Sequence, residues 1–100
     1  MIIHYKILYM QHTNSHKGKI VLEILANIVK EEREKTKKSQ RLLADEYGVQ
    51  KSLVNRIENC NNEPKFLSVF TICEIIGLKP SELMKKIEEK LPEDFSILEE

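Results

Sequence analysis

The side chains with the most specific chemistry in this sequence lie between residues 50 and 57. Five of them carry hydrogen-bonding groups suited to nucleic acid: Gln50, Lys51, Ser52, Asn55 and Arg56. The amides of Gln and Asn match N6 and N7 of adenine, whereas Arg and Lys match O6 and N7 of guanine. Any solvated helix face is polar, so this composition alone is a weak indicator. The stretch contains no Asp or Glu, however, although 16 of the 100 residues are acidic, and this absence favours DNA as a partner.

Two short predicted helices, 40–47 and 50–58, would position these side chains. Their inward faces are apolar and comprise Leu43, Ala44, Tyr47, Val54 and Ile57. Ser39 is a favourable N-cap for the first helix, and Gly48 supplies a turn that can adopt positive φ. Two helices joined by such a turn form a helix-turn-helix, in which the first helix supports the second as it enters a major groove.

The remaining segments also predict helices, and the expected fold class is therefore all-α with five helices. Apolar residues recur with helical spacing in 19–35, 66–76 and 80–91. Gly77 ends the middle one of these, and Pro80 suits the first turn of the last one, because its missing N–H costs nothing there. Three glycines and three prolines are few for a many-stranded sheet, which needs tight turns.

The helices are expected to form one domain, residues 19–91, with a short segment on either side. Residues 1–18 are an N-terminal extension, in which Ile2–Met10 alternates apolar and polar side chains like a β-strand. A single strand would have to pair with another copy, lie along the body or remain unordered. Met10 could instead be the true start of the chain. Residues 92–100 form an acidic tail.

The formal net charge is zero, but the charges are unevenly distributed. Residues 1–80 contain thirteen Lys and Arg against nine Asp and Glu, whereas residues 81–100 contain three against seven. A mildly basic body with an acidic tail is compatible with a DNA partner. The distribution predicts modest non-specific affinity, because a strongly basic chain would coat DNA indiscriminately.

The sequence contains no pattern expected of an enzyme, a metal site or a membrane protein. It has no glycine-rich phosphate loop and no residues that would build an activated nucleophile, so neither catalysis nor a cofactor is expected. His12 and His16 are four residues apart but have no further ligands nearby. Cys60 and Cys73 are too few for a disulfide framework. No stretch approaches the ~20 apolar residues of a membrane span, and a cytoplasmic location is expected.

The segment from Arg33 to Glu58, REKTKKSQRLLADEYGVQKSLVNRIE, resembles the phage Cro/repressor (XRE) family of helix-turn-helix proteins. The similarity continues through Asn62-Glu63-Pro64, Ile76-Gly77-Leu78 and Pro80-Ser81-Glu82-Leu83. It covers about residues 20–91 without a gap. The resemblance implies a five-helix domain like that of the λ repressor.

The resemblance also implies a role for each matched position. Gln40 would contact a DNA phosphate at the start of its helix. The positions that face base edges or neighbouring phosphates are Gln50, Lys51, Ser52, Asn55 and Arg56. Further phosphate contacts are expected from Lys38, Ser39, Asn59, Asn61, Asn62 and Lys65. Arg33 and Glu58 match a largely buried salt bridge that joins the first helix to the end of the third.

Some positions depart from the family pattern. Leu42 and Leu67 stand where polar residues are usual, and with Phe70 they would leave apolar surface that a five-helix monomer does not cover. Lys65 replaces the Ser that often caps the fourth helix. The N-terminal strand or a second copy of the chain could cover the apolar surface. A homodimer has the better rationale, because two-fold symmetry would place two reading helices about 34 Å apart, one turn of DNA.

Two functional hypotheses follow. The first is a sequence-specific transcriptional regulator that binds an inverted-repeat operator in double-stranded DNA, as a small repressor, a restriction–modification controller or an antitoxin does. The alternative is a protein-interaction module, such as an antitoxin that holds a partner protein through its termini, with DNA binding secondary. The operator sequence and the sign of regulation stay open at this point.

Overall fold

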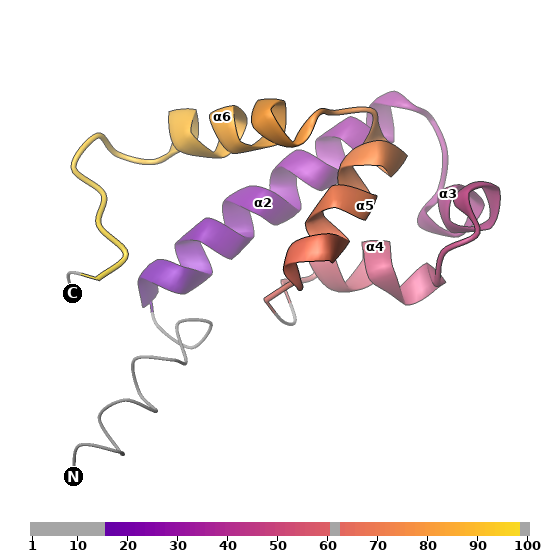
Figure 1. The fold of residues 1–100 in the computed structure, drawn as a ribbon, viewed down its shortest axis with the longest axis horizontal. Coiled ribbons are helices and arrows are strands. Elements are labelled where there is room, and N and C mark those ends of the chain that lie inside the picture. The colour runs from indigo at the N-terminus through magenta and orange to yellow at the C-terminus, as the bar shows by residue number, and fades with distance from the viewer. Residues whose placement is uncertain (1–15, 61–62, 99–100) are drawn as a thin grey trace, which may run out of the picture.

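The structure, a computed structural model, describes residues 16–60 and 63–98 (Figure 1). Helices are labelled as in Figure 1: α2 (His16–Lys35), α3 (Gln40–Tyr47), α4 (Lys51–Glu58), α5 (Phe66–Ile76) and α6 (Pro80–Lys90). The described part of the chain contains these five helices and no strand, which confirms the all-α fold class. The predicted strand Ile2–Met10 lies outside the described residues. None of the described helices is long and apolar enough to cross a bilayer.

The longest helix, α2, organises the arrangement of the others. It runs diagonally through the molecule and contacts α4, α5 and α6, while α3 packs mainly against α4 (Figure 1). The core lies where the helices meet, and each helix contributes to it. Its largest fully buried side chains are Val29, Leu43, Val54, Ile72, Cys73 and Leu83.

Packing rather than intrinsic propensity holds the two shortest helices. α3 and α4 have eight residues each, whereas an isolated helix needs about 12–15 residues to be even marginally stable in water. Burial of Leu43 from α3 and Val54 from α4, at about 1.5–3 kcal/mol for a side chain of this size, supplies the missing stability. The position of α4 is therefore set by the core behind it.

Both ends of α3 are fixed by the local sequence, as predicted. The Oγ of Ser39 accepts a hydrogen bond from the Leu42 N–H at 3.0 Å. Gly48 is left-handed, with φ of 66°, and the Val49 N–H donates to the Ala44 carbonyl at 3.0 Å. This C-terminal turn directs the chain immediately into α4, because glycine adopts positive φ without a steric cost.

Three boundary or burial predictions were wrong. α2 begins at His16 rather than Lys19, and Gly18 is a buried helical residue instead of part of a linker. α4 begins at Lys51, with Gln50 as an extended N-cap. Tyr47 was expected to point inward but is 50% exposed, because it is the last residue of α3 and lies at the turn, where the core ends.

The early start of α2 coincides with a contact from the C-terminal tail. After α6 the chain folds back toward the first turn of α2, where the Lys17 ammonium group lies 5.5 Å from the centre of the Phe95 ring. This cation–π contact is a long-range interaction that helical periodicity in the sequence does not reveal. Phe95 therefore contacts the first turn of α2, whereas residues 92–94 of the tail are exposed.

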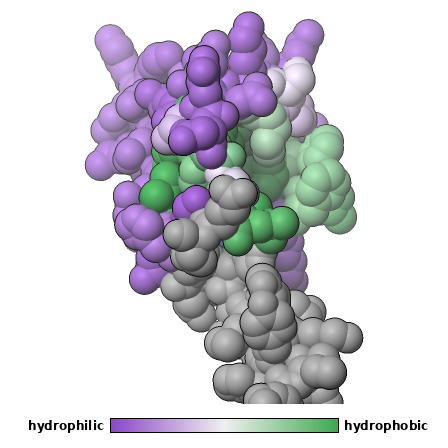
Figure 2. Space-filling model, turned by 90° about the vertical axis from the view of Figure 1, so that its left-hand side faces the viewer, coloured by the Kyte–Doolittle hydropathy of each residue, from purple (hydrophilic) through white to green (hydrophobic). Residues whose placement is uncertain are grey.

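Apolar surface remains exposed on α3 and α5, as the departures from the family pattern predicted. Phe66 and Leu67 are each 75% exposed, and Phe70 and Leu42 are 46% and 45% exposed. The rings of Phe66 and Phe70 meet edge to face, with centroids 5.2 Å apart. Figure 2, which views the left-hand side of Figure 1, shows hydrophobic residues gathered beside a strongly hydrophilic region.

Candidate nucleic-acid interface

One side of α4 is buried and the other is open to solvent. Val54 and Ile57 pack into the core. The open side and its N-terminal edge carry the residues expected to face DNA, namely Gln50, Lys51, Ser52, Asn55 and Arg56. Lys51 and Arg56 are exposed, and Ser52 and Asn55 are half-buried. The structure therefore brings Gln50, Ser52 and Arg56 to one hollow. Asn55 instead contacts the start of α3 through Gln40, and Lys51 is exposed at the first residue of α4.

A bidentate ion pair joins the end of α2 to the end of α4. The Arg33 Nε donates to Glu58 Oε2 at 2.7 Å, and Nη2 donates to Oε1 at 3.0 Å. The third nitrogen, Nη1, donates to the Lys38 carbonyl at 3.0 Å. The side chains of Arg33 and Glu58 are only 14% and 4% exposed. All the donor nitrogens of the guanidinium group are thus used to tie two helices and the connector before α3.

The ion pair holds the proton of Arg33 more tightly in the folded state. The hydrogen bond to Glu58, with the charge of that carboxylate, raises the pKa of Arg33 above its ordinary value. A raised folded-state pKa stabilises the fold at every pH below the unfolded pKa, and this stability is lost only as pH rises through the folded value. Since Arg titrates above about pH 12, the contribution of Arg33 is constant across the neutral range.

Gln40, the first residue of α3, extends this ion pair toward the open side of α4. Its Nε2 donates to Glu58 Oε1 at 3.0 Å, and its Oε1 accepts from the Asn55 Nδ2 at 3.2 Å. The resemblance suggested a phosphate contact for Gln40. In the structure both of its polar atoms are engaged within the protein, which the sequence did not indicate.

The residues expected to contact phosphates do not share one environment in the structure. Lys38 pairs with Glu46 at 2.8 Å on the surface of α3, and Ser39 uses its hydroxyl oxygen to cap that helix. Lys65 and Asn59 are exposed, and Lys65 makes no side-chain capping bond to α5. Asn61 and Asn62 lie outside the described residues.

A hollow of about 420 Å³ with both polar and apolar walls lies between α4 and the start of α5. Ser52 and Arg56 line it from α4, and Glu63, Lys65 and Ser68 line it from the other side. The cationic side chains Arg56 and Lys65 make it suited to a phosphate group of a DNA backbone. Ser68 was not predicted from the sequence, although its place in the first turn of α5, near Lys65, could have indicated it.

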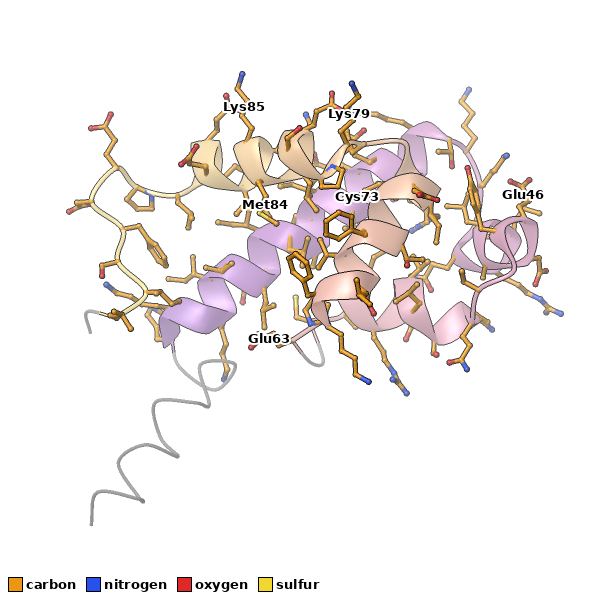
Figure 3. All side chains as sticks on the ribbon, in the orientation of Figure 1. Glu46, Glu63, Cys73, Lys79, Met84 and Lys85 are labelled. Carbon is orange, nitrogen blue, oxygen red and sulfur yellow. The ribbon has the colours of Figure 1, made fainter. Side chains whose placement is uncertain are left out.

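The cysteines show no feature of a metal or catalytic centre. Cys73 lies in the interior (Figure 3), and burial raises the pKa of its thiol. Cys60 is half-buried, its Sγ donates to the Leu22 carbonyl at 3.6 Å, and burial raises its pKa as well. Raised pKa values keep both as neutral thiols, which are poor nucleophiles and ligands. Among the described residues, no group of three or more His, Cys, Asp and Glu is placed to hold a metal ion.

We predict that Glu58→Ala lowers the free energy of unfolding by about 3 kcal/mol, because it leaves the Arg33 guanidinium largely buried without its partner. Urea denaturation followed by circular dichroism measures the loss. Glu46→Ala is the matched control, since it removes the carboxylate of the exposed Lys38 pair and should change stability little. Equal midpoints for Glu58→Ala and the unchanged chain would contradict a structural role for the ion pair.

Comparison with known families agrees with this geometry. A family model described as helix-turn-helix matches residues 29–83, more than half of the chain, and the match includes all of α3, α4 and α5. The searches of curated proteins and of solved structures each found no match. The chain therefore belongs to the XRE-type helix-turn-helix family of DNA-binding regulators.

Proposed function

We propose that the chain is a sequence-specific transcriptional regulator that places α4 in the major groove of double-stranded DNA as a homodimer. The observation that carries this proposal is the two-sided character of α4. Its back is fixed in the core by Val54 and Ile57, while the polar side chains on its open side are neutral or basic: Lys51, Ser52, Asn55 and Arg56. A helix that reads the major groove must be held firmly from behind and must present polar side chains that are not acidic.

The open side of α4 offers two kinds of contact. Lys51 and Arg56, both exposed, supply cationic donors that match O6 and N7 of guanine. Lys65, across the hollow from Arg56, would hold the DNA backbone in register. Direct contacts to base edges give sequence preference, whereas contacts to phosphates give affinity that depends on salt.

The distribution of charge supports the same orientation on DNA. The tail after α6, which contains Glu93 and Asp94, lies at the opposite end of the molecule from α4 (Figure 1). The basic residues Arg56 and Lys65 line the hollow beside α4 together with Glu63, and the basic Lys51 is exposed at the start of α4. A chain without net charge would thus approach DNA with this surface and retain modest affinity for random sequence.

The exposed apolar residues of α5 support a homodimer. An aromatic and aliphatic surface formed by Phe66, Leu67 and Phe70 is exposed to water, and no other described residue of the chain covers it. A second copy would bury it. Two-fold symmetry would then present two copies of α4 to an inverted-repeat operator, one half-site each.

A protein-interaction role is the second candidate, and a different surface favours it. A cavity of about 460 Å³ with mostly apolar walls lies between α2, α5, α6 and the tail, and Met84 and Ile97 at its edge are partly exposed. A partner protein could insert an apolar side chain there. In an antitoxin, this contact would be primary and DNA binding secondary.

We expect Arg56→Ala to leave folding unchanged, because the side chain is exposed, and to cost about 1–3 kcal/mol of binding to the preferred DNA site. Fluorescence anisotropy on that site and on random DNA measures both affinities. Lys85→Ala is the control, because Lys85 projects from α6 on the far side of the molecule from α4 (Figure 3). An equal loss on preferred and random DNA would reduce Arg56 to a phosphate contact.

We further expect the chain to sediment with the mass of two copies at micromolar concentration. Replacement of Phe66 and Phe70 by Ser should shift the mass toward one copy, because the aromatic surface would no longer be apolar. Sedimentation of the unchanged chain as a single copy under these conditions would argue against the homodimer.

A further inference from the structure

We propose that Gln40 is a positioning residue that fixes the amide of Asn55, so that Asn55 selects adenine at one position of the DNA site. This inference rests on the proposed function, because it assigns a base to one side chain of the α4 surface. It starts from the chain of hydrogen bonds that leads from the ion pair of Arg33 and Glu58 through Gln40 to Asn55.

The Glu58 carboxylate determines which way Gln40 points. A carboxylate paired with Arg33 is ionised and can only accept hydrogen bonds. Gln40 lies 3.0 Å from Glu58 Oε1 and must therefore direct its NH₂ group toward it. A reversed Gln40 amide would bring its carbonyl oxygen against a negatively charged oxygen in a poorly hydrated site, where such repulsion is strong.

Gln40 in turn determines which way Asn55 points. Once the NH₂ group of Gln40 is committed to Glu58, its carbonyl oxygen faces Asn55 and can only accept. Asn55 must therefore present its own NH₂ group, whose nitrogen lies 3.2 Å from Gln40 Oε1. A reversed Asn55 would set two carbonyl oxygens against each other. Both amide orientations thus follow from the single charge on Glu58.

The fixed orientation leaves a defined edge of Asn55 for DNA. Its Oδ1 accepts no hydrogen bond from any described residue, and its nitrogen has a second hydrogen that Gln40 does not use. An acceptor beside a donor is the pattern that pairs with N6 and N7 of adenine. Guanine presents two acceptors in the same place, so its O6 would face Oδ1 and be rejected. Asn55 is half-buried next to exposed Arg56, on the open side of α4.

The experiment compares binding of the full-length chain to its preferred DNA site and to every single base-pair variant of it. The unchanged chain should prefer adenine over guanine at one position by roughly 5- to 150-fold. Asn55→Ala should abolish the preference at that position and leave the others intact. Gln40→Met, which keeps the side-chain length but has no amide, should weaken the preference at the same position, and the double variant should lose nothing more.

Lys65→Ala is the matched control, because loss of a phosphate contact should weaken binding to all sites equally. If Gln40→Met behaves in this uniform way, the positioning role is overturned and Gln40 is a phosphate contact. If Gln40→Met does not fold, Asn55→Asp decides. Asp offers only acceptors and would face the Gln40 carbonyl oxygen without a donor, so the adenine preference should be lost. Retention of the adenine preference by Asn55→Asp would overturn the inference.

Different results would overturn the assignment of adenine to Asn55 and the proposed DNA-binding function. An unchanged chain that shows a clear sequence preference unaffected by Asn55→Ala would overturn the adenine assignment alone. An unchanged chain that binds all DNA sequences equally would overturn the proposed function, and the inference with it.

Discussion

The bidentate ion pair between Arg33 and Glu58 is the contact on which the reading surface depends. It joins the last turn of α2 to the last residue of α4, and Gln40 adds the first residue of α3 to the same carboxylate. Charges buried to this degree are costly unless every donor and acceptor is used. The third donor of Arg33, to the Lys38 carbonyl, also fixes the connector between α2 and α3. One polar cluster therefore sets the mutual positions of three helices.

The apolar core and this polar cluster have complementary roles. Burial of Val54 and Leu43 holds α4 and α3 in place. Apolar contacts have no preferred direction, however, so the two helices could still shift slightly against each other. The ion pair with Gln40 has a required geometry, so it limits those shifts. In this account the core supplies stability, and the polar cluster supplies the precision with which the open side of α4 meets DNA. The left-handed turn at Gly48 makes the close approach of the two short helices possible.

The sequence predicted what is determined locally. The bounds of α3 and α5 were predicted correctly, because Ser39, Gly48 and Gly77 mark helix ends in ways that depend on neighbouring residues alone. The start of α2 was missed, since Gly18 was assigned to the extension, whereas the structure buries it within the helix. The hydrogen bonds of Gln40 were missed because they depend on the distance between helices. The DNA contacts of the individual side chains stay predictions.

Selection of bound fragments from a random pool of double-stranded DNA tests the central claim most directly. We predict enrichment of one half-site repeated in inverted order, with half-site centres about 10 base pairs apart, because two copies of α4 must enter successive major grooves on one side of the DNA. Failure to enrich any sequence, even at low salt where all DNA binding is strengthened, would contradict it.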